Sequence, residues 1–226
     1  MFAQIYSMQS VEEALACVKA GADRIGVLTE EADGAYPCGV SKELCKEIFK
    51  AVGNQAVKVL ISVKDNEEAI IAETKELNPD VLHLCAEYRG NPSFREKLRA
   101  ACPDVLLMEA VGVTGEEAIE DAIYRASYAD IILLDTVAVD VPGIGAAGKT
   151  HDWSIDRRIK EAVTVPVILA GGLGPENVLA AMNTVHPDGV DSLTATSIKE
   201  NGKLVRKDIA RVTQFCDIVH QYQETL

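Results

Sequence analysis

Cations are scarce in this chain. Its 226 residues include 22 Lys and Arg against 35 Asp and Glu, which gives a formal net charge of −13 at pH 7. Because an acidic protein gains nothing from counterion release, we expect neither nucleic acid nor an anionic membrane as a partner. A phosphorylated small molecule remains compatible with this charge, since backbone N–H groups and a few local cations are enough to bind one.

Long apolar runs and paired cysteines are also missing. No window approaches 18 uninterrupted apolar residues, so we expect no transmembrane span, and residues 1–6 lack a basic segment followed by an apolar one. With only four histidines and no CxxC pair, the sequence shows neither a zinc pattern nor a disulfide framework. We therefore expect a cytoplasmic protein with reduced cysteines, no metal and no cofactor. The six cysteines stand singly at Cys17, Cys38, Cys45, Cys85, Cys102 and Cys216.

Short apolar runs alternate with longer stretches whose apolar residues recur at helical spacing. The runs cover residues 2–6, 24–28, 57–63, 81–84, 105–113, 131–134, 165–170 and 189–191. The helical stretches cover residues 11–20, 41–52, 66–77, 92–101, 115–127, 154–162, 175–185 and 207–222. No low-complexity segment or linker divides them. Eight such units predict an α/β protein with one domain, residues 1–226, folded as a (β/α)8 TIM barrel. An open doubly wound sheet is the alternative, but residues 7–10 lack the glycines that would bind a dinucleotide.

Residues typical of helix ends support these boundaries. Ser41 and Asp65 stand where N-caps belong, and Pro175 stands where a first-turn proline belongs. Gly21 and Gly53 follow helical stretches, where a left-handed cap is expected.

Polar residues at the carboxyl ends of the predicted strands are the candidates for chemistry, because (β/α)8 barrels carry their active sites at that face. Asp135 directly follows an apolar run and is a candidate general acid or base. The alternative is that Asp135 caps the loop that follows it. His83 lies within the fourth run and is either a catalytic residue or a histidine of the core.

Glu109 is a carboxylate inside an apolar strand, which is costly unless it is paired. If it faces the barrel interior, Lys58 or Lys64 on the third strand is an available partner, and Glu109 becomes a catalytic candidate. If it faces outward, it is an interface or surface residue.

Two small-residue turns late in the chain predict a phosphate site. Gly171 and Gly172 follow the seventh run, and Asp191, Thr194 and Ala195 follow or end the eighth. Loops after the seventh and eighth strands of such barrels often bind phosphate through backbone N–H groups. The alternative is that the glycines only make a tight turn.

The longest irregular stretch runs from residue 136 to residue 152 and contains Gly145, Gly148 and Asp152. A loop of this length after a strand is usually functional, and on a barrel it lies at the active face. We expect it to border the site.

Several motifs resemble those of the phosphoribosylanthranilate isomerase family. Residues 169–178 match its L-A-G-G-L-x-P-x-N-V motif, and residues 82–83 resemble the histidine of its Q-L-H-G motif. Residues 133–135 and 145–153 are similar to its L-L-D followed by G-G-T-G-x-x-F-D-W. The resemblance runs from the first strand to the last helix and implies an Amadori rearrangement, which turns an aminoaldose phosphate into an aminoketose.

The resemblance implies that Asp135 is the general acid that opens the sugar ring. The family's base is a first-strand cysteine, for which this chain has Tyr6. The family's substrate-binding arginine after the second strand is missing from the acidic segment 29–34, and Thr194 and Ala195 stand in place of a serine-glycine pair. Tyr6, Glu109 and His83 are the candidates for a substitute base.

Three functions remain open from the sequence. The chain is a phosphoribosylanthranilate isomerase with a substituted base, or a paralogue that isomerises, epimerises or cleaves another phosphorylated sugar, or a non-catalytic sugar-phosphate-binding protein. A metal-dependent epimerase using His83 is a minor variant of the second. A monomer and a homodimer are equally compatible with the sequence.

Overall fold

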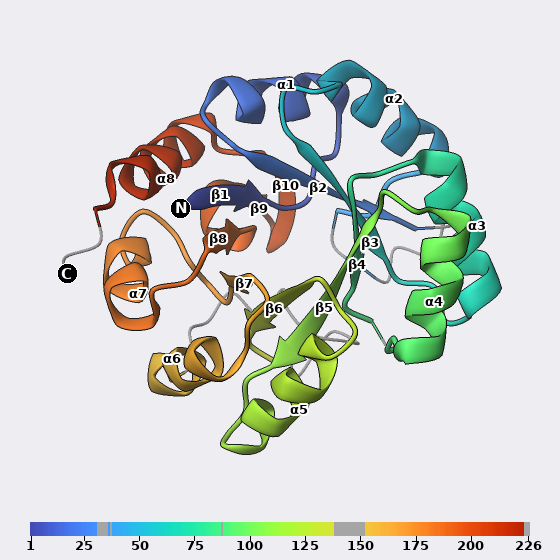
Figure 1. Ribbon diagram of the computed structural model, residues 1–226. Coiled ribbons are helices and arrows are strands. Elements are labelled where there is room, and N and C mark those ends of the chain that lie inside the picture. Colours follow the sequence, from blue (N-terminus) through green and yellow to red (C-terminus); the bar gives the residue numbers. More distant parts are fainter. Residues whose placement is uncertain (31–35, 37, 87, 138–151, 224–226) are drawn as a thin grey trace.

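Eight parallel strands close into a barrel, and helices surround it on the outside (Figure 1). The computed structural model describes residues 1–30, 36, 38–86, 88–137 and 152–223. The strand order is β1-β2-β3-β4-β5-β6-β7-β8, with β8 pairing back to β1. The predicted (β/α)8 barrel is therefore confirmed. Among the described helices, none is long and apolar enough to span a membrane.

The strands of the barrel are β1 (Phe2–Ile5), β2 (Arg24–Thr29), β3 (Val57–Ser62), β4 (Val81–Leu84), β5 (Leu106–Gly112), β6 (Ile131–Asp135), β7 (Val167–Leu169) and β8 (Gly189–Ser192). The helices are α1 (Val11–Lys19), α2 (Lys42–Val52), α3 (Glu67–Leu77), α4 (Pro92–Ala101), α5 (Glu117–Ala126), α6 (Trp153–Ala162), α7 (Val178–Val185) and α8 (Ile209–Gln221).

Side-chain caps begin several of these helices. Ser10 and Ser41 accept hydrogen bonds from backbone N–H groups three residues later and start α1 and α2. The cap of α3 is Asn66 and not the predicted Asp65, because the Asn66 side chain accepts from the Ala69 N–H. Helix α7 begins at Val178, so the predicted first-turn Pro175 lies in the turn before it.

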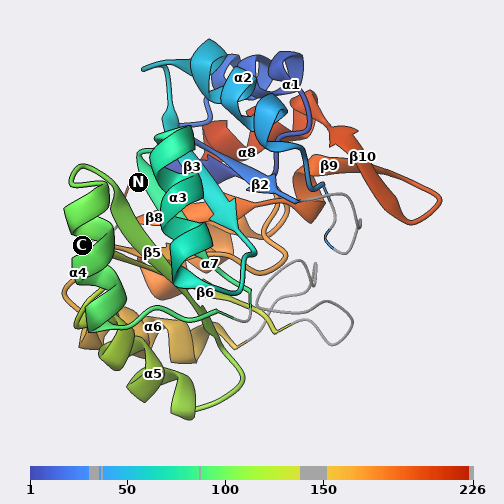
Figure 2. The same ribbon diagram turned by 90° about the vertical axis from the view of Figure 1, so that its right-hand side faces the viewer.

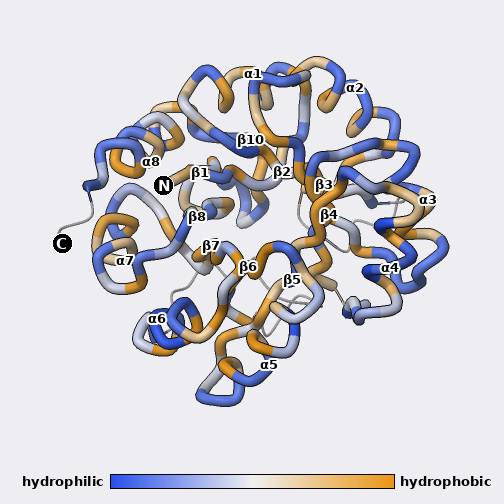
Figure 3. The backbone as a smooth tube through the Cα atoms, in the orientation of Figure 1, coloured by the Kyte–Doolittle hydropathy of each residue, from blue (hydrophilic) through white to orange (hydrophobic). Residues whose placement is uncertain are grey.

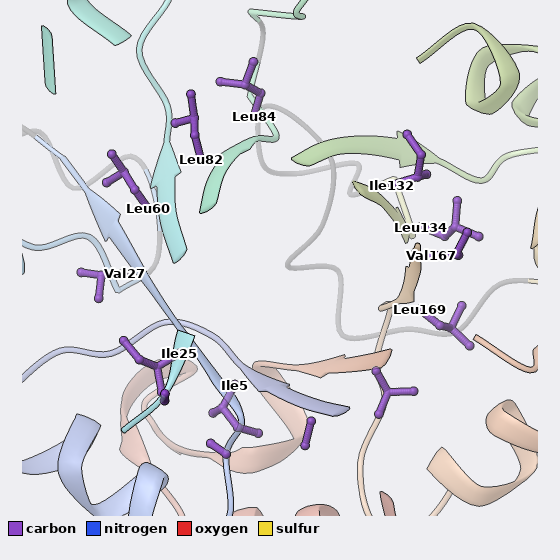
Figure 4. Packing of buried hydrophobic residues seen from close by; sticks show 14 of the residues in the cluster. Ile5, Ile25, Val27, Leu60, Leu82, Leu84, Ile132, Leu134, Val167 and Leu169 are labelled. Atoms are coloured by element: carbon purple, nitrogen blue, oxygen red, sulfur yellow. The ribbon is translucent and has the colours of Figure 1, made fainter. Parts of the chain in front are cut away.

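Two apolar layers result from the alternation along each strand. One layer fills the barrel, with residues such as Val59, Met108 and Ile168. The other lies between the strands and the helices, where Ile25, Leu82 and their neighbours point away from the barrel axis (Figure 4). Figure 3 shows the strands as largely hydrophobic, whereas the helices also carry hydrophilic turns. Each strand therefore presents one set of side chains to the interior and the next set to the helices.

A β-hairpin between β8 and α8 was not predicted from the sequence. Strands β9 (Ser197–Glu200) and β10 (Lys203–Lys207) pair in an antiparallel manner and project from one end of the barrel (Figure 2). Its turn residues Asn201 and Gly202 both have positive φ, 50° and 80°. An Asn-Gly pair between strands is a strong hairpin signal, but the prediction assigned no element between the eighth run and the final helix at Lys207.

Candidate functional site

Four of the sequence-predicted residues lie on the inner side of the barrel near the carboxyl ends of the strands. Tyr6 follows β1 and packs with the interior layer. His83 lies two residues after the interior residue Val81 on β4, and Asp135 lies two residues after the interior residue Leu133 on β6. Residues two apart on a strand face the same side, so both side chains face the interior. Asp191 on β8 is bonded to Gln4 of β1, as described below. These groups share the face at which barrel enzymes hold their substrates.

Tyr6 and His83 form a buried pair. The Tyr6 hydroxyl lies 3.1 Å from His83 Nδ1, and the ring centroids are 5.6 Å apart. The Tyr6 ring lies against Gly26 of β2, where a Cβ atom would overlap it. Burial raises the Tyr6 pKa well above 10, and burial followed by the charge of Arg89 lowers the His83 pKa to about 3. Tyr6 therefore keeps its proton and His83 stays neutral near pH 7.

Asp135 and Asp191 flank the end of β7. Leu134 pairs with Leu169, and Leu169 pairs with Val190, so the next residue on each strand shares one row of the barrel. The row reads Asp135, Ala170 and Asp191. Because Ala170 carries only a methyl group, little separates the two carboxylates at the interior, and the charge of Asp135 contributes to raising the pKa of Asp191.

Asp191 itself is almost fully buried. Its Oδ1 accepts a hydrogen bond of 3.1 Å from Nε2 of Gln4, which is completely buried on β1. Burial raises the Asp191 pKa to about 8, the Gln4 hydrogen bond opposes that rise, and the charge of Asp135 adds to it. The phosphate contact predicted for Asp191 stays a prediction: an acid with a pKa of about 8 is mostly protonated at pH 7, and only its ionised form repels an anion.

Glu109 lies on the other side of its strand. Its neighbour Met108 faces the interior, so Glu109 faces the helix layer, where it is completely buried. Its Oε2 accepts from Arg125 Nη1 of α5 at 2.9 Å, and its Oε1 accepts from the Gly90 N–H at 2.9 Å. Lys58 and Lys64 were named as partners only for an inward-facing Glu109, so they do not apply to the outward orientation that the structure shows. Glu109 is outward-facing, as one alternative stated, yet it is not at the surface.

The two predicted phosphate loops lie against each other. Gly171 and Gly172 have φ values of 88° and 65°, a region that favours glycine. A Cβ on Gly174 would lie 2.7 Å from that of Ala195, so the loop after β7 touches the short 3-10 helix Thr194–Thr196 after β8. The Ser192 hydroxyl donates to the Leu173 carbonyl at 2.6 Å and ties the two loops together.

Inside the first of these loops, Asn177 fixes the backbone. Its Nδ2 donates to the Gly172 carbonyl at 3.1 Å, and its Oδ1 accepts from the Gly174 N–H at 2.9 Å. Among the residues that the structure describes, neither Gly171 nor Gly172 donates its N–H to a protein acceptor. This loop therefore offers backbone donors that are held in place and find no acceptor within the described part of the chain.

The predicted loop residues divide between described and undescribed parts of the chain. Gly145 and Gly148 lie outside the described residues. Asp152 is the N-cap of α6, where its Oδ1 accepts from the Ser154 N–H at 2.9 Å. Asp135 Oδ1 accepts from the Thr136 N–H at 2.7 Å, which resembles the capping role that the sequence left open, and the two roles are compatible.

Gln4 and Lys207 were not singled out from the sequence. Lys207 is buried, and its Nζ donates to the Tyr6 carbonyl and, at 2.9 Å, to the Ser197 hydroxyl. Its backbone N–H donates to Glu13 at 2.5 Å. Strand alternation predicts that Gln4 faces inward between Phe2 and Tyr6, so its role could have been inferred. Residues 207–208 resemble the family's closing K-D pattern, but that resemblance implied no role for Lys207.

Metal-binding clusters are a separate question. Within the described part of the chain, no group of three or more His, Cys, Asp or Glu side chains is arranged to hold a metal ion.

Comparison with known proteins identifies relatives along almost the whole chain. A family model described as N-(5'phosphoribosyl)anthranilate (PRA) isomerase matches residues 3–217. The N-(5'-phosphoribosyl)anthranilate isomerase of Haloferax volcanii is 33% identical over 196 residues, which cover 85% of this chain and 81% of the relative. That of Aquifex aeolicus is 33% identical over 212 residues, which cover 94% of this chain and 95% of the relative.

Solved structures agree. The crystal structure of phosphoribosyl anthranilate isomerase from Thermotoga maritima matches with a TM-score of 0.78 at 26% identity, covering 98% of this chain and all of that one. A phosphoribosyl anthranilate isomerase in complex with reduced 1-(o-carboxyphenylamino)-1-deoxyribulose 5-phosphate has the same fold, with a TM-score of 0.76 at 24% identity and coverage of 98% and 100%. With the barrel, the glycine loop and the family match all in agreement, this chain belongs to the N-(5'-phosphoribosyl)anthranilate isomerase family.

Proposed function

We propose that this protein isomerises a phosphorylated amino sugar from the aldose to the ketose form, with N-(5'-phosphoribosyl)anthranilate as the first candidate substrate. The observation that carries the proposal is the position of Asp135. It lies at the carboxyl end of β6 on the inner side of the barrel, one strand away from the glycine loop after β7. The candidate acid and the proposed anion site thus lie on neighbouring strands, so one sugar phosphate can contact both.

In the proposed reaction, the Asp135 carboxyl group donates a proton to the ring oxygen of the sugar. The bond between C1 and the ring oxygen breaks with its electron pair on oxygen, and the nitrogen lone pair forms a C=N bond to C1. A base then removes the proton from C2, and C1 gains a proton when the ketose forms. The reaction is an internal redistribution, since C2 is oxidised and C1 is reduced.

Phosphate would bind at the loop of Gly171 and Gly172, close to Thr194 and Ala195. Support comes from the positive φ of the two glycines, their unused N–H donors and the contact between the two loops. Backbone donors suit this chain because its net charge is −13. A structure with the same fold holds a phosphorylated ligand, reduced 1-(o-carboxyphenylamino)-1-deoxyribulose 5-phosphate, which supports a phosphorylated substrate for this protein.

Arg89 is our candidate for holding the other end of the substrate. It follows β4, which stands opposite β8 in the closed order of eight strands. Its side chain is partly buried, and its Nη1 is buried without a hydrogen-bond partner among the described residues. Its charge also lowers the pKa of His83 and Cys85, which line the interior. A substrate with phosphate over β7 and β8 would extend its carboxylate toward this guanidinium.

A related substrate without a carboxylate is the second candidate. It is favoured by the sequence from Thr29 to Gly34, which is acidic and lacks the arginine that the family places there. A protein that only binds a sugar phosphate is less well supported, because Asp135 has no evident purpose in binding an anion.

The decisive experiment follows the fluorescence of N-(5'-phosphoribosyl)anthranilate with the purified protein. Loss of fluorescence at an enzymatic rate supports the proposal. A parallel reaction uses the N-phenyl analogue, which differs only in lacking the carboxylate. Because its aldose and ketose forms have the same mass, the product is detected by chromatographic separation of the two isomers. Turnover of the analogue alone supports the second candidate. No turnover of either compound contradicts an isomerase acting on arylamine ribosyl phosphates.

A further inference from the structure

The proposed isomerisation needs a base, and most of the polar groups in the barrel are poorly suited to be one. Tyr6 holds its proton, and neutral His83 binds one only below about pH 3. Cys85 follows β4 at the interior, but burial raises its thiol pKa to about 12. Glu109 faces the helices. A general base works best when its pKa lies near the working pH, so Tyr6, His83 and Cys85 do not fit. Glu109 is excluded by its orientation, because its carboxyl group does not face the barrel interior.

Asp191 differs from them in position. It shares a row with Asp135 across the small residue Ala170, so a sugar held over β7 lies between two carboxyl groups. One acid then stands on each side of the strand from which the Gly171 loop begins. Isomerisation needs a proton donor at the ring oxygen and a proton acceptor at C2 of the same sugar, and two separated carboxyl groups supply both.

Gln4 gives independent support. Its side chain is completely buried, and its Nε2 donates to Asp191 while its Oε1 has no partner in the described part of the chain. An amide can bond either form of a carboxyl group, because its N–H donates to the carboxylate and its oxygen accepts from the protonated acid. The unused Oε1 beside Asp191 thus provides an acceptor for the proton that Asp191 gains.

We infer that Asp191 is the general base of this protein, in the role that the family gives to a first-strand cysteine, and that Gln4 is its positioning residue. The inference rests on the proposed isomerase function. The Asp191 carboxylate takes the proton from C2. The C–H electron pair becomes the C1–C2 double bond, and the C=N pair returns to nitrogen. Asp191 then gives its proton to C1 as the enol becomes the ketone, and the enol hydroxyl proton passes to Asp135, so both carboxyl groups are restored and no other reactant is needed.

Charged groups around Asp191 keep its titration within reach of neutral pH. Asp135 on β6 raises its pKa, whereas the Gln4 hydrogen bond and Lys207 at the end of β10 lower it. Tyr6 at the end of β1 is uncharged because it keeps its proton. Burial is the largest influence, and the resulting pKa is about 8. A carboxylate of this basicity accepts a proton far better than an exposed aspartate does.

The test compares kcat and kcat/KM from pH 6 to pH 10 for the wild-type protein and two variants. In the wild type, kcat/KM should rise with pH through a midpoint near 8. Asp191→Asn should lower kcat at least about 10²-fold, with little change in the inhibition constant of inorganic phosphate. Gln4→Leu keeps the volume but removes the N–H donor, so its midpoint should move up by about one pH unit. A merely structural role for Gln4 would change the rate without moving this midpoint.

The outcomes separate this inference from the proposed function. Wild-type protein that turns over neither arylamine ribosyl phosphate contradicts both. Active wild type together with near-normal turnover by Asp191→Asn contradicts only the role of Asp191. If Tyr6→Phe abolishes the rise with pH while Asp191→Asn retains it, Tyr6 is the base and the inference is wrong. An unmoved midpoint in a folded Gln4→Leu variant contradicts the pairing with Gln4.

Discussion

Replacing Arg125 with Met should make the stability of this protein depend strongly on pH. Arg125 donates to Glu109, which is completely buried and has no other side-chain ion pair among the described residues. Burial raises the pKa of Glu109 to about 7 even with Arg125 present, whose charge opposes the rise. Without that charge the pKa moves higher. Met keeps much of the Arg125 volume, so the charge is the main thing lost.

The sign follows from the folded and unfolded pKa values. The unfolded value is about 4.5 and the folded value is higher, so the unfolded chain releases its proton first. The stability associated with Glu109 is complete below about pH 4.5 and falls as the pH rises through the folded pKa. In wild type this loss ends near pH 7, whereas in the variant it continues to the higher pKa.

The magnitude can be worked out from that difference. Each further pH unit before the carboxyl group ionises costs about 1.36 kcal/mol. Between pH 6 and pH 7 the variant should be less stable by about 1 kcal/mol, from the lost hydrogen bond. By pH 9 the deficit should reach about 3 kcal/mol, within the range found when one partner of a buried ion pair is removed.

Urea unfolding at pH 6, 7, 8 and 9 measures this deficit. Arg157→Met is the matched control, because Arg157 pairs with Glu161 on the exposed face of α6. Its effect should stay near about 0.5 kcal/mol at every pH. The double variant Arg125→Met with Glu109→Gln should lose the pH dependence. A deficit for Arg125→Met that is the same at pH 6 and pH 9 would refute the reasoning.

Three further outcomes are expected. Asp135→Asn should lower turnover at least about 10²-fold and leave the inhibition constant of phosphate nearly unchanged, and near-normal kinetics would show that Asp135 only caps its loop. Gly26→Ala should lower the free energy of unfolding in urea by about 1–3 kcal/mol, because its Cβ overlaps the Tyr6 ring. Adding Tyr6→Ala should recover part of that loss, and strictly additive effects of the two substitutions would contradict the overlap. Arg89→Met should raise KM for the carboxylated substrate but not for the N-phenyl analogue, and equal effects on both would remove Arg89 from the substrate site.

The barrel and the positions of the main site residues were predictable because they depend on local patterns. Each strand is a short apolar run, and a polar residue at its end, such as Asp135, must emerge at the active face. The alternation of two along β4 and β5 also decides that His83 faces inward and Glu109 outward. The sequence left open only which of the two alternating sets of side chains faces the barrel interior.

Partners across long sequence separations were not predictable. Glu109 binds Arg125, which is 16 residues away on α5. From the sequence, Lys58 and Lys64 were the two candidate partners, and only for an inward-facing Glu109. The pKa values that decide which group can act as a base depend on burial by several elements, so Asp191 was assigned to phosphate by its place in the chain. The hairpin at Asn201 is a different case, because its signal was local and was overlooked.

The hydrogen bond between Gln4 and Asp191 joins residues that are 187 positions apart. It belongs to the seam between β1 and β8, the last pair of barrel strands that a growing chain can form. Until β8 has been synthesised, β1 has one edge without a strand partner, and an open edge invites pairing with other chains. Non-local closure of this kind is slow. Asp191 therefore enters the site only when the ring closes, and partly synthesised barrels remain both inactive and prone to aggregate.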